Sequence, residues 1–190
     1  MVALVVVLLI LLVFGGYLVG AYNGLVQVRE AVKLAWSNID VLLVQRHDEL
    51  PKLVEVCKQY MQYEPGTLER VMRARSGVDA ARTSGNVASL GPAEGELRAG
   101  LSRLYAVAEN YPDLKASESF RHLQERISGL ETAIADRREQ YNDAVNTNNV
   151  RIASFPGALV AGMGNFSQAH LLQFESAEKA DVDLKAAFSR

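Results

Sequence analysis

The chain has little cysteine or histidine and no marked excess of charge of either sign. It holds one cysteine, Cys57, and three histidines among 190 residues. A single cysteine excludes an intrachain disulfide and leaves the redox compartment undecided. The formal net charge of −2 gives no overall basic field that would attract nucleic acid. A small arginine cluster lacks interleaved aromatic residues and fits a solvated helix face: Arg70, Arg73, Arg75 and Arg82. We expect no nucleic-acid partner.

Residues that act as nucleophiles or metal ligands form no recognisable motif. None of the three histidines belongs to a His-Glu-x-x-His sequence, which would put two ligands on one helical face. His122 and Glu125 lie one helical turn apart but lack the second motif of di-metal bundles, so we expect a surface contact. Cys57 lies in an apolar stripe, where a thiol is usually buried and inert. The sequence predicts a non-enzymatic protein without catalytic residues, metal or cofactor.

Charged side chains are also absent from Met1 to Val28. At about 1.5 Å per residue this stretch reaches roughly 42 Å as a helix, more than the hydrocarbon core of about 30 Å. A cleaved secretory signal has a basic start and a shorter apolar run, and a helix on a soluble domain needs a polar face. We predict a retained transmembrane anchor helix over residues 1–28.

Three glycines of the anchor, Gly16, Gly20 and Gly24, fall at intervals of four residues. Such spacing lets a neighbouring helix approach closely within the bilayer, which would support a homo-oligomer. Glycine is also common in spans that face lipid alone, so both interpretations stay open.

The charges that flank the anchor predict its orientation. Arg29, Lys33 and Arg46 follow the anchor, and only the amino terminus precedes it. This bias predicts a short N terminus outside and a helical domain on the cytoplasmic side, with a periplasmic domain as the alternative.

Apolar residues past the anchor recur at helical intervals from Leu25 to Met61, and the phase continues through Pro51. We predict one long helix from the membrane to about Tyr63, kinked at Pro51. A second helix, capped by Thr67, is expected to run to Thr83.

We expect a loop over 84–95 and a third helix ending before Tyr111. A fourth helix is expected from the cap Ser117 to Phe155, with a heptad seam that includes Arg137 and Asn148. No strand pattern is found. The predicted fold is all-α, with the N-terminal transmembrane helix continuous with an antiparallel bundle of three to four long helices over 29–155.

Two further segments allow more than one interpretation. Arg46 and His47 lie in the apolar stripe beside Asp48, which indicates either a functional polar site or, as we favour, an ionic contact between helices. The C-terminal segment 156–190 begins within an apolar, uncharged run that is too short to cross a membrane as a helix. It is predicted to cover the bundle end, or to touch the membrane surface or a second subunit. Its candidate interface residues are Leu159, Val160, Met163, Phe166 and Phe174.

Two stretches of the chain have the character of family signatures. The first runs from Ala35 to Leu43 and on through Gln45-Arg46-His47-Asp48 and Leu50-Pro51, and the second includes Tyr141-Asn142, Asn149 and Phe155-Pro156. Both resemble the signatures of the LemA family. One departure is Asn148, where the family has a second tyrosine. The family motif and bundle-core residues are then Trp36, Asn38, Asp40, Arg46, His47, Pro51, Tyr141, Asn142, Asn149, Phe155 and Pro156.

The resemblance implies a single-pass protein of the bacterial inner membrane, from a family without an established biochemical activity. One branch is associated with magnetosome membranes, and other members accompany another membrane protein. Two functions are consistent with the sequence. The first is a self-assembling membrane scaffold in contact with lipid and with its own copies. The second is a membrane-tethered adaptor or sensor that binds another protein through helices 2 and 3 and the predicted loop 84–95.

Overall fold

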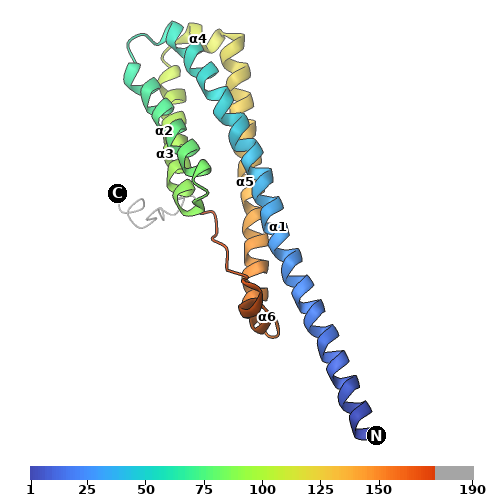
Figure 1. Ribbon diagram of the computed structural model, residues 1–190. Coiled ribbons are helices and arrows are strands. Elements are labelled where there is room, and N and C mark those ends of the chain that lie inside the picture. The colour runs from blue at the N-terminus through green and yellow to red at the C-terminus, as the bar shows by residue number, and fades with distance from the viewer. Residues whose placement is uncertain (174–190) are drawn as a thin grey trace, which may run out of the picture. The chain divides into compact units, whose positions relative to one another are not determined.

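The computed structural model describes residues 1–173, and this part of the chain is helical without a strand (Figure 1). The helices are α1 (Val2–Tyr60), α2 (Pro65–Thr83), α3 (Val87–Ala108), α4 (Pro112–Ala116), α5 (Glu118–Ala153) and α6 (Gly157–Gly164). The predicted all-α class with a long apolar N-terminal helix is confirmed. The five-residue helix α4 was not predicted.

Helix α1 is continuous over 59 residues, and Pro51 lies inside it, as the unbroken stripe predicts. Proline within a helix costs about 3 kcal/mol because it lacks an N–H and crowds the preceding turn. Leu50, Leu53 and Val54 are all buried next to it. Burial contributes about 1.5–3 kcal/mol for each such side chain, so the three side chains together outweigh the cost of the proline.

The described chain divides into two compact units, and α1 and α5 each contribute to both. Unit 1 contains residues 1–46 and 128–171. In it, Arg151 of α5 contacts Gly24 of α1, and Tyr141 of α5 contacts Trp36 of α1. Contacts further along α1 therefore involve residues further back along α5, so the two helices run antiparallel in this unit.

Unit 2 contains residues 47–127 together with the described residues from Leu172. Here Arg126 of α5 pairs with Glu49 of α1, and α2 packs along α3. Its apolar core is rich in leucine and also contains valine, alanine and single residues of other types. Its most deeply buried members include Leu50, Leu53, Cys57, Val71, Leu90, Leu97, Leu101, Leu104, Leu114 and Ile127. Unit 2 is thus a helical bundle with a core of its own.

The predicted loop 84–95 is wrong beyond its first residues. Helix α3 begins at Val87, and Asn86 caps it by accepting a hydrogen bond from the Ala88 N–H at 3.1 Å. Pro92 lies within this helix. The side chain of Leu90 is fully buried, so the apolar stripe of α3 starts before the proline and stabilises the first turns.

The predicted cap Thr67 is also wrong. Helix α2 begins at Pro65, whose fixed φ suits the first helical position, with Glu64 as the residue before it. Thr67 is buried, and its hydroxyl donates to the Glu64 carboxylate at 3.3 Å.

The predicted cap Ser117 is confirmed, because its hydroxyl accepts a hydrogen bond from the Phe120 N–H at 3.4 Å. The predicted seam positions of α5 are buried or half-buried except Arg137, which is exposed and donates to Gln140. Asn148 is buried at its seam position.

Candidate membrane anchor and interaction surfaces

The N-terminal part of α1 is long and apolar enough to cross a membrane. None of its most apolar 18-residue window is buried by the rest of the described chain. A core helix would be covered by neighbours, whereas here nearly every large side chain from Val2 to Tyr22 is exposed. The segment therefore has the surface of a helix that meets lipid.

The three spaced glycines of this segment differ in their surroundings. Gly16 and Gly20 have open space where a Cβ would stand. At Gly24 a Cβ would lie 2.9 Å from Nη1 of Arg151, and the same nitrogen donates to the Gly24 carbonyl at 3.3 Å. The expectation that Gly24 packs against a neighbouring span is therefore corrected, because the chain's own α5 side chain occupies that space.

Helix α6 packs on this part of α1. Val160, Ala161 and Phe166 form a buried cluster with Leu25, and the edge of the Tyr22 ring meets the Phe166 ring at 5.4 Å between centroids. Val160 and Phe166, two of the five predicted interface residues, are thus covered by the chain itself, which corrects their assignment.

The other predicted interface residues differ from this pair. Leu159 and Met163 are 59% and 86% exposed, and Phe174 lies outside the described residues. Phe155 was expected in the bundle core, but it is 78% exposed. It follows the end of α5 and precedes α6, so neither helix covers its ring.

Motif residues on α5 hold the segment that follows α6. The Tyr141 hydroxyl donates to the His170 carbonyl at 3.0 Å, and burial raises the pKa of that tyrosine. The Asn149 amide donates to the Ala169 carbonyl and accepts from the Ala169 N–H, both at 2.9 Å. The backbone groups of this irregular segment have no helix or sheet partner, and these side chains satisfy them instead.

The other motif residues of unit 1 occupy different environments. The Trp36 ring meets Tyr141 edge-on at 5.7 Å between centroids and is half-buried, as are Asp40 and Asn142. Asn38 is exposed, so its assignment to the core is wrong, whereas Arg46 is buried.

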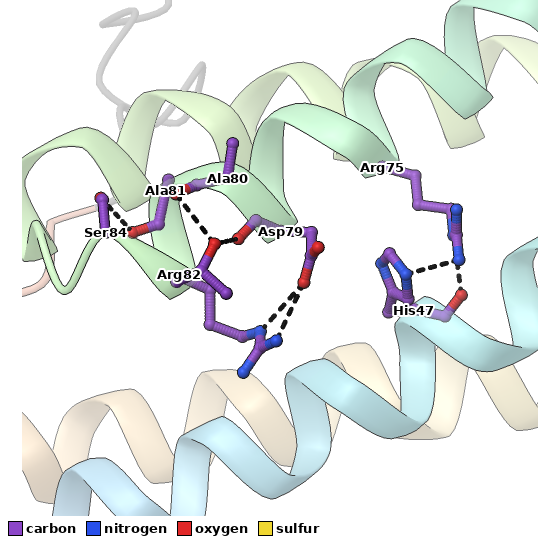
Figure 2. A network of polar contacts seen from close by, with 8 residues as sticks. His47, Arg75, Asp79, Ala80, Ala81, Arg82 and Ser84 are labelled. Atoms are coloured by element: carbon purple, nitrogen blue, oxygen red, sulfur yellow. Dashed lines mark hydrogen bonds and ion pairs between the residues drawn. The ribbon is translucent and has the colours of Figure 1, made fainter.

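Figure 2 shows His47 of α1 and Arg75 of α2 directed toward one another. The Arg75 guanidinium donates to the His47 carbonyl at 2.9 Å and contacts the imidazole Nε2. On α2, Arg82 donates to the Asp79 carboxylate at 2.9 Å and holds the pKa of that carboxyl below its ordinary value. His47 therefore joins α1 to α2, as a contact between helices would, but its partner is an arginine and the contact is a hydrogen bond rather than the ionic contact that we favoured.

A second polar contact stabilises unit 2. Glu49 is buried and accepts hydrogen bonds from Lys52 at 3.0 Å and from Arg126 at 2.9 Å. The hydrogen bond from Lys52 has the largest effect and the one from Arg126 adds to it, so the pKa of Glu49 is held below its ordinary value. A carboxylate that is buried and paired in this way is typical of a structural contact.

Cys57 is fully buried, and burial raises the pKa of its thiol to about 12. Within residues 1–173, no three side chains of His, Cys, Asp or Glu are grouped closely enough to hold a metal ion.

A groove in unit 2 was not found by sequence reasoning. It has a volume of about 460 Å³. Its lining includes Val54 of α1 and Met61, which directly follows α1, together with Leu68 and Met72 of α2. The apolar spacing of these residues indicated only core positions, and only their packing reveals a depression at the surface.

A family model described as the LemA family matches residues 35–186. The chain belongs to the LemA family. It is 26% identical to the magnetosome protein MamQ 2 of Paramagnetospirillum magneticum, over 90% of this chain and 71% of that protein. The magnetosome protein MamQ of Magnetospirillum gryphiswaldense is 24% identical, over 77% of this chain and 62% of that protein. Protein LemA of Metamycoplasma hominis is 27% identical, over 87% of this chain and 74% of that protein.

Membership agrees with the geometry above. This LemA-family protein is a membrane-associated helical protein with one N-terminal apolar helix long enough to cross the bilayer. Its motif residues Tyr141 and Asn149 make contacts within the chain, so the motif explains part of the fold and leaves the physiological task open.

Proposed function

We propose that this protein is a non-enzymatic scaffold that is anchored in the bacterial inner membrane and self-assembles there. The observation that carries the proposal is the open glycine face of α1. Gly16 and Gly20 lie one turn apart within an exposed apolar segment, and no other part of the described chain fills the space beside them. Small residues at this spacing favour close packing of membrane helices.

The continuity of α1 is a mechanical reason to expect a scaffold. Because the same helix extends from Val2 into unit 2, association of two anchors would constrain the helical domains that follow. The MamQ relatives are magnetosome proteins by name, which supports an association with a membrane.

The test is the size of the full-length protein in mild detergent. The wild type should form a homo-oligomer, and the double variant Gly16→Leu/Gly20→Leu should be monomeric, because leucine fills the packing surface. Gly15→Leu is the matched control: it is in the same segment, lies about 100° around the helix from Gly16, and has similar open space. A monomeric wild type, or identical oligomers for all three chains, would contradict the proposal.

We propose a cytoplasmic helical domain, on the basis of Arg29, Lys33 and Arg46 after the anchor. A Glu139→Cys variant, exposed on α5, tests this orientation. An impermeant maleimide should label it in lysed spheroplasts and not in intact ones. Labelling in intact spheroplasts would place the domain in the periplasm.

An adaptor is the second candidate, and the groove of unit 2 favours it. Met72, which is half-buried in the lining of this groove, is an adaptable apolar contact of the kind found at binding surfaces. An adaptor should copurify with a different protein at a fixed ratio, and Met72→Glu should abolish that association. If Met72→Glu leaves the copurified protein and its ratio unchanged, the groove is not its binding site.

A further inference from the structure

Helix α6 has an apolar outer face that no part of the described chain covers. Its sequence contains only glycine, alanine, leucine, valine and methionine. Val160 and Ala161 face the buried cluster, whereas Leu159 and Met163, one turn apart, are exposed. A helix that is apolar on every side is normally surrounded by an apolar medium.

The position of α6 along α1 indicates which medium this is. The exposed apolar stretch of α1 ends near Tyr22, because Leu25 and Val28 are buried by the chain itself. From Val2 to Tyr22, at about 1.5 Å per residue, the helix is roughly 30 Å long, which matches the hydrocarbon core of a bilayer. Leu18 and Ala21 pack against the cluster that Val160 and Ala161 of α6 form with Leu25, which places α6 at one boundary of that core.

Aromatic and basic side chains follow in the order expected at such a boundary. Tyr22 is exposed beside α6, and the Arg29 guanidinium lies 5.1 Å from the Phe166 ring centroid. Arg29 is seven residues beyond Tyr22, which is about 10 Å along the helix. Arg151 is also exposed and contacts Gly24. Hydrocarbon, aromatic and cationic groups in this order match the acyl, interfacial and phosphate layers of a leaflet.

We propose that α6 is a membrane-interface helix whose outer face, Leu159 and Met163 with Phe155 beside them, inserts into the acyl boundary of the leaflet next to the helical domain. Lipid is the occupant because this face is continuous with the lipid-exposed surface of α1. A shallow hollow lined by Leu18, Val19, Tyr22, Val160, Met163 and Gly164 joins the two. Helix α6 thereby fixes how deeply α1 is inserted in the bilayer. This inference rests on α1 as the anchor and is independent of self-assembly.

The test uses the full chain with Met163→Cys labelled by the environment-sensitive fluorophore NBD. Cys57 is fully buried, so the parent chain should remain unlabelled and serve as the labelling control. The protein is placed in phosphatidylcholine/phosphatidylglycerol vesicles at a low protein-to-lipid ratio. Emission from position 163 should be blue-shifted and quenched by a nitroxide at the top of the acyl chain, and aqueous iodide should have no effect. Leu159→Cys should behave in the same way.

Two matched labels separate this inference from its premises. Glu139→Cys, exposed on α5, should be quenched by iodide and not by nitroxide lipid. Leu8→Cys, in the apolar run, should be quenched by a nitroxide deep in the acyl chain, which reports insertion of α1 independently. Iodide quenching at position 163 would overturn the inference. Protection from both quenchers would show that protein covers α6, which would overturn it as well.

Discussion

The two units of this protein differ in what surrounds their apolar side chains. In the described part of unit 2, only Tyr60 and Tyr63 are exposed among the large apolar residues. Unit 1 exposes almost every large apolar residue from Val2 to Tyr22, and Leu159 and Met163 in addition. Unit 2 therefore has the surface of a bundle that faces water, whereas part of the surface of unit 1 requires a second apolar environment.

The ion pairs of one glutamate in each unit give a second contrast. Glu49 of unit 2 is paired by two cations from different positions in the fold. Glu30 of unit 1 is exposed and contacts Arg29 and Lys33 of its own helix. A pair that joins two helices stabilises the fold, whereas a solvent-exposed pair within one helix contributes little.

The largest expected effect is a difference between the same substitution in the two units. Leu104→Ala removes a fully buried side chain of unit 2 and should lower the free energy of unfolding by about 2–5 kcal/mol. Leu12→Ala, at an exposed position of α1, should change it by less than about 0.5 kcal/mol. Urea unfolding of the full chain in mild detergent, followed by circular dichroism, measures both. Equal losses would contradict the contrast.

A smaller and local effect is expected at Asn149. Asn149→Ala removes two hydrogen bonds to Ala169, each with a net contribution of about 0.5–1.5 kcal/mol. Amide exchange at Ala169 should accelerate while the core of unit 2 keeps its protection. Asn146→Ala, at an exposed position of α5, is the matched control and should leave exchange unchanged. If Asn149→Ala also leaves Ala169 protected, these bonds do not hold the segment.

The smallest effect concerns pH. Because Lys52 and Arg126 lower the folded-state pKa of Glu49, the ionised carboxylate stabilises unit 2 above the ordinary value of 4.5, and this stabilisation is lost as the pH falls through the lowered pKa. Glu49→Gln should remove that part of the acid dependence, about 1 kcal/mol, in pH-dependent denaturation curves. Glu30→Gln should leave the unfolding of the helical domain unchanged. Identical curves for Glu49→Gln and the wild type would refute the role of this carboxylate.

The long helices could be predicted from the sequence because their signals are local and repeated. The stripe through Pro51 and the seam of α5 each extend over many turns, so one unfavourable residue does not outweigh them. The start of α3 could not be predicted in this way. Gly91 and Pro92 are strong local breakers, and the burial of Leu90 that overrides them is a tertiary contact.

Which residues belong to the candidate interaction surfaces could not be predicted from the sequence, for a similar reason. Gly24 matches Gly16 and Gly20 in spacing, but its neighbour Arg151 lies 127 residues further along the chain. Likewise, the run that contains Leu159 and Val160 is uniformly apolar, and only packing on Leu25 separates the exposed residue from the buried one.

Imaging of the full-length protein in lipid nanodiscs large enough for several copies is the most direct test of the central claim. The account predicts two or more chains in each particle, with neighbouring α1 helices in contact at Gly16 and Gly20 within the bilayer. Particles that contain a single chain, or copies that associate with their α1 helices apart, would contradict it.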